Sequence, residues 1–346
     1  MMAPAFYSNR SAVAFATLLV VLLALPVILK QLGLPKRTNL YNGISQTFGT
    51  NTSIDQTIYG GPVHSDVVLL GSSTMIAGFP PGSVDEYFSK HLGRPAVVKY
   101  LTMQYSGSDK QYLLLADYLA AHTTDLIVSA LPWRTYTTKG PSHDINSILR
   151  FGEFSDDFSE VSDVDRMRIY SEMVVAGPRQ LLNEVRPNQP FAEKFDDVKR
   201  SQERGIDGPF VTDSLTAPSS LEESCVIPVT SRSIRMLRDW NSAYDYAALF
   251  YRKIAELAKS RNTPIVLVNF PELTDYGSKD IPVNLSLNSA FRKDQKMIAA
   301  SSADLFGNIS NERYRNFFRD DVHLNANGSR LFDSIALPAL YRLYRH

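Results

Sequence analysis

The stretch Val67-Val68-Leu69-Leu70-Gly71-Ser72-Ser73 decides the fold that this sequence predicts. Four apolar residues in a row end abruptly at a glycine and two serines. Such a run is typical of a strand in a parallel sheet that is buried on both faces. Functional side chains gather where parallel strands end, so the two serines are the first candidates for chemistry.

Strands and helices alternate along the chain around this stretch. The predicted strands are residues 66–70, 96–101, 126–131 and 264–270, and the predicted helices are residues 83–92, 109–122, 243–259 and a last one from Ala326, which Pro338 should kink or break. The alternation predicts an α/β fold, a three-layer α/β/α sandwich around a parallel sheet. We expect this domain to occupy residues 63–346.

The alternation stops between about residues 134 and 235. This part is polar, with scattered proline, glycine and acidic residues and one helical stretch around residues 166–174. We expect it to be an insertion in the domain or a lid over a site. Residues 33–62, which are rich in Asn, Thr, Gly and Gln, are expected to form a stalk or wrapping segment before the first strand.

The amino-terminal region carries an uncharged apolar stretch at residues 11–29. About 20 apolar residues are needed for a helix to cross the hydrocarbon core of a bilayer. We therefore expect a short tail at residues 1–10 and a transmembrane signal anchor at residues 11–32. The alternative, a cleaved signal peptide, would have a shorter apolar core and a small-residue cleavage site.

Two opposing arguments bear on the orientation of this anchor. Positive charges are more numerous after the apolar stretch than before it, which favours a cytoplasmic body. The charges are Arg10 before the stretch and Lys30, Lys36 and Arg37 after it. Single amino-terminal anchors more often place the body outside, so we expect a single-pass protein of the cell membrane with an extracytoplasmic or periplasmic domain.

The composition argues against several classes of function. Lys plus Arg and Asp plus Glu number 36 each, so the chain has no net field that would attract nucleic acid. The only cysteine, Cys225, has no partner for an intrachain disulfide. The histidines are dispersed and none has the spacing of metal ligands, so we expect neither a metal nor another cofactor.

A second motif lies far along the chain, immediately before the last predicted helix. It reads Asp320-Asp321-Val322-His323-Leu324-Asn325. An Asp three positions before a His can curl back and accept the proton of Nδ1, which fixes the imidazole for catalysis. With a serine that attacks a carbonyl, the three residues Ser73, His323 and Asp320 would form an acyl-transfer triad.

Two alternatives remain open within this motif pair. Ser72 could replace Ser73 as the nucleophile, and Asp321 could replace Asp320 as the residue that orients the imidazole. The other histidines lack a comparable acidic setting and are expected to have structural or solvent-exposed roles; they are His64, His91, His122, His143 and His346.

These motifs resemble sequence blocks of the SGNH/GDSL hydrolase superfamily. Gly71-Ser72-Ser73 resembles the first block, usually Gly-Asp-Ser, and Asp320-x-x-His323 resembles the last one. Ser106-Gly107-Ser108 resembles the block whose glycine amide helps to bind the oxyanion. The resemblance implies that Ser73 is the nucleophile and that the backbone amides of Ser73 and Gly107 form the oxyanion hole.

Two departures from the pattern refine this resemblance. Ser72 replaces the Asp of the first block, as in membrane-anchored branches that include the D-alanyl transfer proteins and other cell-envelope O-acyltransferases and esterases. The third block, Gly-x-Asn-Asp, is absent after the third predicted strand. Gln104, Trp133 or Arg134 could supply the missing hydrogen-bond donor or bind substrate.

The resemblance implies a membrane-anchored serine esterase or O-acyltransferase. We expect it to act on acyl groups, acetyl first of all, of a cell-envelope or secreted glycan, together with envelope-assembly partner proteins. One alternative is a lipid esterase, which would need a deep apolar pocket. Another is a catalytically silent scaffold in a glycan-assembly complex, which the absent asparagine favours, since an oxyanion donor contributes a few kcal/mol.

Overall fold

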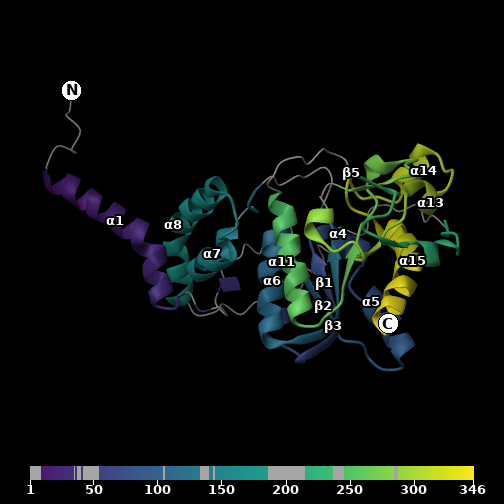
Figure 1. The fold of residues 1–346 in the computed structure, drawn as a ribbon, viewed down its shortest axis with the longest axis horizontal. Helices are drawn as coiled ribbons and strands as arrows, with labels where there is room; N and C mark the ends of the chain where they lie inside the picture. Colours follow the sequence, from purple (N-terminus) through teal and green to yellow (C-terminus); the bar gives the residue numbers. More distant parts are fainter. Residues whose placement is uncertain are drawn as a thin grey trace. The chain divides into compact units, whose positions relative to one another are not determined.

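The computed structural model describes residues 9–34, 36, 40–41, 54–103, 106–132, 140–142, 145–185, 215–236, 245–283 and 287–346. The chain divides into two compact units (Figure 1). Unit 1 consists of Met1–Ser45 and Asp144–Pro190, and unit 2 consists of Gln46–His143 and Phe191–His346. Four residues for which roles were expected lie outside the described residues: Gln104, Trp133, Arg134 and His143.

A six-stranded sheet forms the centre of unit 2, with the strand order β2-β1-β3-β6-β8-β4. Its strands are β1 (His64–Gly71), β2 (Val98–Thr102), β3 (Thr123–Ala130), β4 (Val226–Pro228), β6 (Ile265–Val268) and β8 (Lys296–Ile298). All pairings are parallel except that of β4 with β8, which is antiparallel. The predicted α/β class is confirmed, and the sheet is mixed rather than wholly parallel.

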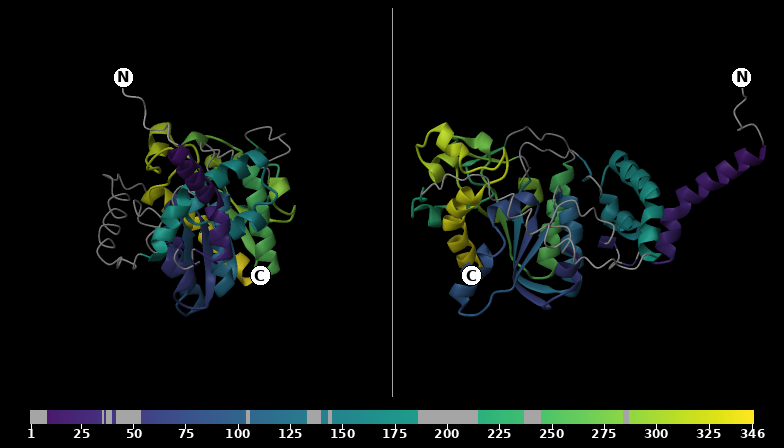
Figure 2. Two further views of the ribbon diagram at one scale, coloured as in Figure 1. Left: turned by 90° about the vertical axis from the view of Figure 1, so that its left-hand side faces the viewer. Right: turned by 180° about the vertical axis from the view of Figure 1, so that it is seen from behind.

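Helices cover both faces of this sheet, because β1 is apolar on both. The run from Val67 to Leu70 is fully buried, and successive side chains of a strand point to opposite faces. Helices α6 (Ser108–Ala121) and α11 (Tyr246–Ser260) lie on one face, and α4 (Ser73–Gly78), α5 (Ser83–Leu92) and α15 (Ala326–Arg345) lie on the other (Figures 1 and 2). This is the three-layer arrangement that the sequence predicts.

An aromatic cluster joins three of the elements that surround the carboxyl end of the sheet. Phe79 caps α4, Phe270 follows β6 and Phe332 belongs to α15. Their ring centroids lie 5.0–5.9 Å apart in edge-on or tilted contacts, which are favourable geometries for aromatic pairs. The cluster therefore fixes α4 and the start of α15 against each other.

Two differences from the expected elements concern the central sheet and the last helix. Strands β4 and β8 were not predicted because three residues are too short to show a period, and β4 lies within the segment expected to be an insertion or lid. Helix α15 also continues across Pro338 to Arg345, although a break was expected. Burial of Leu340 and the contact of Tyr341 with Phe88 favour the helix enough to offset the missing N–H of proline.

The remaining described elements of unit 2 are short. They are α3 (Ile54–Tyr59), α10 (Leu221–Ser224), β5 (Ile234–Met236), η5 (Leu273–Asp275), β7 (Ile281–Val283), α12 (Leu287–Ala290), α13 (Ser302–Phe306) and α14 (Asn311–Arg315). Strands β5 and β7 form a separate two-stranded sheet. Helix α3 buries Ile54 and Ile58 against α6 and β2, so the end of the segment expected to be a stalk packs on unit 2.

Unit 1 is helical in its described part. It contains α1 (Asn9–Gln31), η3 (Ile145–Ser147), α7 (Phe151–Asp157) and α8 (Asp163–Val185). Of the helices that the structure describes, α1 alone is long and apolar enough to cross a membrane, with a mean hydropathy of 2.9 over the most apolar 18 residues of Arg10–Gln31. Helix α1 packs against α7 and α8. The apolar helix predicted near the amino terminus is therefore present, as a membrane anchor or a signal sequence.

Candidate active site

Ser73 stands at the carboxyl end of β1, as the first residue of α4. This tight exit requires a glycine at position 71, because a Cβ there would lie 2.9 Å from Cβ of Met75 and 3.0 Å from Cβ of Ala130. The carbonyl of Gly71 also accepts a hydrogen bond of 3.0 Å from the Ser106 hydroxyl. This bond joins the segment after β2 to the end of β1, which fixes the backbone just before Ser73.

The loop that carries His323 is closed at its base. The N–H of Arg319 donates to the carbonyl of His323 at 2.9 Å, and Phe318 pairs with Leu324 in an antiparallel bridge. Asn325 then caps α15, accepting from the N–H groups of Asn327 and Gly328. An N-cap side chain of this kind satisfies helix donors that have no partner within the helix. The loop and the helix start therefore form one ordered structure.

A continuous chain of hydrogen bonds connects three predicted residues. The Nε2 atom of His323 lies 2.8 Å from Oγ of Ser73. Its Nδ1 atom lies 2.8 Å from each carboxylate oxygen of Asp320. Asp320 Oδ1 also accepts from the backbone N–H groups of Val322 and His323, at 3.0 and 2.9 Å, which orients the carboxylate. The fold thus closes a sequence separation of 250 residues.

The two competing residues have other partners. The hydroxyl of Ser72 lies 3.1 Å from that of Thr74. The backbone carbonyl of Asp321 accepts from the N–H of Leu273 at 2.9 Å, which connects the loop to the segment after β6. The hydrogen bonds to the His323 ring therefore come from Ser73 and Asp320, the residues that the sequence analysis preferred over Ser72 and Asp321.

The electrostatics of the pair suit a neutral imidazole beside a charged carboxylate. Burial lowers the pKa of His323 below its ordinary value, and the Asp320 carboxylate opposes this shift only in part. Burial by itself would raise the pKa of Asp320, but hydrogen bonds from Val322 and His323 outweigh it and the pKa is lowered. Near neutral pH the imidazole can therefore accept a proton from Ser73, as a general base must.

The expected oxyanion donor Gly107 already has a hydrogen-bond partner. Its N–H donates to Oγ of Ser142 at 2.9 Å. Ser142 is fixed in turn by the buried carboxylate of Asp109, which accepts from both its hydroxyl and its N–H, and from Tyr246. A substrate oxygen could use the Gly107 amide only by displacing the Ser142 hydroxyl. The backbone amide of Ser73, in contrast, lies in the first turn of α4, where helix N–H groups have no acceptor within the helix.

A small pocket adjoins the hydrogen-bonded residues at the carboxyl end of the sheet. It is lined by Thr74, Leu131, Pro132, Asn269, Phe270, Glu272 and Val322. Thr74 and Val322 are the chain neighbours of Ser73 and His323, so the pocket lies near these two residues. Its walls include a proline and a phenylalanine ring, and the space between them has a volume of about 10 Å³, room for about one water-sized group.

Asn269 in this pocket was missed by sequence reasoning. It was included in the predicted strand 264–270, but β6 ends at Val268 and Asn269 follows its carboxyl end. The residue is 7% exposed, and its side-chain amide has no hydrogen-bond partner among the residues that the structure describes. The available signal was that Asn269 is the only polar residue in an otherwise apolar run.

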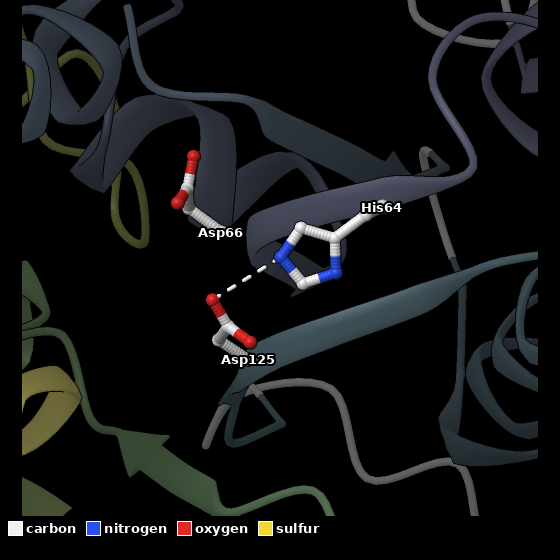
Figure 3. Close-up of side chains that lie close together, drawn as sticks. All are labelled: His64, Asp66 and Asp125. Carbon is white, nitrogen blue, oxygen red and sulfur yellow. Dashed lines mark hydrogen bonds and ion pairs between the residues drawn. The ribbon is translucent and has the colours of Figure 1, made fainter. Parts of the chain in front are cut away.

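A second cluster of polar side chains lies at the opposite end of the strands (Figure 3). His64 and Asp66 stand at the start of β1 and Asp125 near the start of β3, with ligand atoms within 4.8 Å of one another. His64 Nε2 lies 3.2 Å from Asp125 Oδ2. By residue type and spacing, these three side chains could hold a divalent cation.

The hydrogen bonds of Asp66 argue against a cation in this cluster. Asp66 is 1% exposed, and both its oxygens accept from the guanidinium of Arg94. The backbone N–H of Val97 and the hydroxyl of Tyr344 add two further bonds, of 2.7 and 3.0 Å. A metal ion would have to displace the guanidinium and lie beside its positive charge. The cluster is better described as a network that joins β1, β3 and the end of α15.

Three further candidate residues, His91, His122 and Cys225, contact backbone groups away from Ser73. His91 bonds to the carbonyl of Tyr87, and the ring nitrogens of His122 contact the carbonyls of Ile58 and Pro62. Cys225 is buried, which raises the pKa of its thiol to about 11. A thiol of this kind is a poor nucleophile.

Comparison with known proteins adds no assignment. No protein-family model matches this chain, and no curated protein matches its sequence.

Proposed function

We propose that this protein is a serine hydrolase or O-acyltransferase of the SGNH type, with Ser73 as nucleophile, His323 as general base and Asp320 as the residue that orients His323. The single observation that carries the proposal is the chain of 2.8 Å hydrogen bonds from Asp320 through His323 to Ser73. The parallel α/β/α fold and the position of Ser73 at a strand end support it.

The reaction would follow two steps. In the first, His323 Nε2 takes the proton of Ser73 while Oγ forms a bond to the carbonyl carbon of an ester, and the alcohol leaves with that proton. In the second, water or a sugar hydroxyl gives its proton to His323 and attacks the acyl carbon. The bond from that carbon to Oγ breaks, and His323 returns the proton to Ser73. Asp320 stays charged throughout and stabilises the imidazolium that forms in each step.

The pocket beside Ser73 suits the acyl group of the substrate. Its walls at Pro132 and Phe270 favour a short acyl group such as acetyl over a fatty acyl chain. The side-chain amide of Asn269 is a neutral donor within this pocket and would bind the acyl carbonyl oxygen, where a third-block asparagine is absent from the sequence. With an apolar helix at the amino terminus, the substrate we propose is an acylated glycan of the cell envelope.

The experiment uses the full-length protein in detergent micelles. Hydrolysis of p-nitrophenyl acetate is measured for the wild type, Ser73→Ala and Ser72→Ala, alongside covalent labelling by a fluorophosphonate. We expect Ser73→Ala to lose both signals and Ser72→Ala to keep them, because the Ser73 hydroxyl bonds to His323 and the Ser72 hydroxyl contacts that of Thr74. Labelling that persists in Ser73→Ala would overturn the assignment of the nucleophile.

One observation favours the catalytically silent alternative. The Gly107 amide, which would help to bind an oxyanion, donates to Ser142. If this state persists with substrate present, the wild type would show neither hydrolysis nor labelling. In that case Ser142→Ala, which frees the Gly107 amide, should restore labelling of Ser73 if the rest of the site is competent.

A further inference from the structure

The second half of α1 belongs to the packing of unit 1. Tyr170 of α8 donates to the carbonyl of Leu23 at 2.7 Å, and Lys30 donates to the hydroxyl of Ser155 in α7 at 3.0 Å. Gly177 of α8 lies so close that a Cβ there would be 2.9 Å from Cδ2 of Leu25. Small residues allow apolar helices to approach in this way. A signal sequence that is removed would leave these partners exposed, so we infer that α1 is retained.

The charged ends of α1 define how deep its contacts with α8 would lie in a membrane. Arg10 and Lys30 bound the apolar stretch and are twenty residues apart, which is about 30 Å of helix and equals the hydrocarbon thickness. Leu23, whose carbonyl bonds to α8, lies about 10 Å from the Lys30 end. Whatever packs against α1 there must lie at the level of the headgroups and the adjoining acyl chains.

Helix α8 has an apolar stripe that adjoins this packing. Val164, Met167 and Val175 are 79%, 74% and 80% exposed, and Leu181 is 39% exposed. At 100° per residue, these four positions fall within an arc of about 120°. Ile169 and Met173 on the opposite side are buried. Large apolar side chains this exposed in one row usually mark an interaction surface.

We propose that this stripe of α8 contacts lipid, so that unit 1 lies on the membrane through two helices rather than one. The occupant is identified by continuity with α1, since a helix fixed beside the last turns of a membrane-spanning helix lies in the interfacial layer. Figure 2 shows α8 alongside the end of α1 within unit 1. The inference concerns the membrane surface and does not depend on the reaction at Ser73.

The charges of α8 indicate what kind of lipid surface suits it. The helix carries three arginines and four acidic residues, a net charge of −1. Arg168 and Glu172 pair with each other at 3.3 Å rather than forming a basic face. Attraction to anionic lipid therefore contributes little, and burial of the apolar stripe provides the affinity. We expect the contact to be independent of lipid charge.

The experiment places a fluorescent probe on α8 in the full-length protein. Met167→Cys, Val175→Cys and a control, Glu160→Cys, are each labelled with an environment-sensitive dye and reconstituted into phosphatidylcholine vesicles. Glu160 is an exposed polar position of the same unit. The native Cys225 is buried, so the unmodified protein serves as the labelling blank. All three positions are exposed, so the substitutions leave packing intact.

Quenching by brominated phospholipids then decides the question. We expect the dyes at positions 167 and 175 to be quenched at least about twofold, equally in neutral and anionic vesicles, because the stripe inserts among acyl chains. The dye at position 160 should stay unquenched. Dyes at 167 and 175 that remain as water-accessible as the one at 160 would overturn the proposal. So would dyes that are shielded but unquenched, since a protein partner or a second copy would then cover the stripe.

Discussion

Replacing Asp320 by asparagine changes the state of His323 while leaving the loop intact. Oδ1 of Asp320 accepts from two backbone N–H groups, those of Val322 and His323, and an amide oxygen can keep both bonds. The amide NH₂ must then occupy the place of Oδ2, which lies 2.8 Å from Nδ1 of His323. Nδ1 also lies 2.8 Å from the retained oxygen Oδ1, but that oxygen has lost its charge and already accepts two backbone bonds. The NH₂ group therefore favours the tautomer in which Nδ1 accepts and Nε2 carries the proton. The nitrogen that faces Ser73 can no longer take its proton.

The magnitudes of the two effects of this substitution differ widely. A hydrogen bond to a charged group contributes about 1.5–3 kcal/mol. The Asp320 side chain is 44% exposed, so solvent screening reduces the loss of stability to less than about 1 kcal/mol. Loss of the correct tautomer in a serine triad costs on the order of 10⁴ in kcat, equivalent to about 5 kcal/mol of barrier. Activity should therefore collapse in a protein that is still folded.

The assay compares Asp320→Asn with Asp321→Asn, a matched control one residue away. Turnover of p-nitrophenyl acetate and the unfolding temperature are measured for both full-length variants and the wild type. Asp321→Asn should keep wild-type turnover, since Asp321 contributes its backbone carbonyl to the structure. The reasoning is refuted if Asp320→Asn retains activity within about tenfold of the wild type, or if the two variants lose it equally.

Four further predictions concern the same unit. Turnover should fall as the pH drops through a pKa below about 6.5, since burial lowers the pKa of His323; a midpoint above 6.5 in the pH–rate profile would contradict this. Asn269→Ala should lower kcat by roughly 10²-fold if the amide binds the acyl oxygen, whereas unchanged kcat with a higher KM would assign it to ground-state binding. Asn325→Ala should lower the free energy of unfolding by about 1–2 kcal/mol, because it removes the cap of α15, as denaturant titration would measure. Burial raises the pKa of Asp333 to about 8, so the folded state binds more protons than the unfolded state between about pH 4 and 8 and stability decreases as the pH rises through that range; Asp333→Asn should abolish much of this decrease, and an identical pH dependence in both proteins would be contrary evidence.

The long strands were predictable from sequence and the short ones were not. β1 and β3 each contain an unbroken apolar run, which reads as a strand buried on both faces without reference to any partner. β4 and β8 have three residues each, and their strand state comes from pairing with each other and with β6. Asn269 was missed for a related reason, because an apolar run does not reveal at which residue the strand ends.

Local sequence spacing predicts one part of the candidate site, the Asp320–His323 pair, but not the contact of this pair with Ser73. The Asp320–His323 pair follows from an Asp three positions before a His in one turn, and its hydrogen bonds are all made within that loop. That Ser73 meets this pair depends on strand order and on the packing of α15, which no local pattern contains. The hydrogen bond from the Gly107 amide to the Ser142 hydroxyl could not be predicted from local spacing either. The two residues are 35 apart in sequence and meet only through the fold.

The two ends of α15 explain how such a distant pair of residues is held at hydrogen-bonding distance. β1 (His64–Gly71) runs from the end that carries Asp66 towards Ser73. α15 (Ala326–Arg345) runs in the opposite sense, from the loop of His323 to the end that carries Tyr344. At one end His323 bonds to Ser73, and at the other the Tyr344 hydroxyl bonds to Asp66 and Asp125.

A helix attached to the same strand at both ends cannot slide along it without breaking one attachment. Sliding by a single helical residue, about 1.5 Å, would already break a hydrogen bond of 2.8 Å. The polar network at the amino end of the sheet therefore helps to position the imidazole at the carboxyl end. This also accounts for the uninterrupted course of α15 across Pro338, since a break there would detach Tyr344 and release the helix.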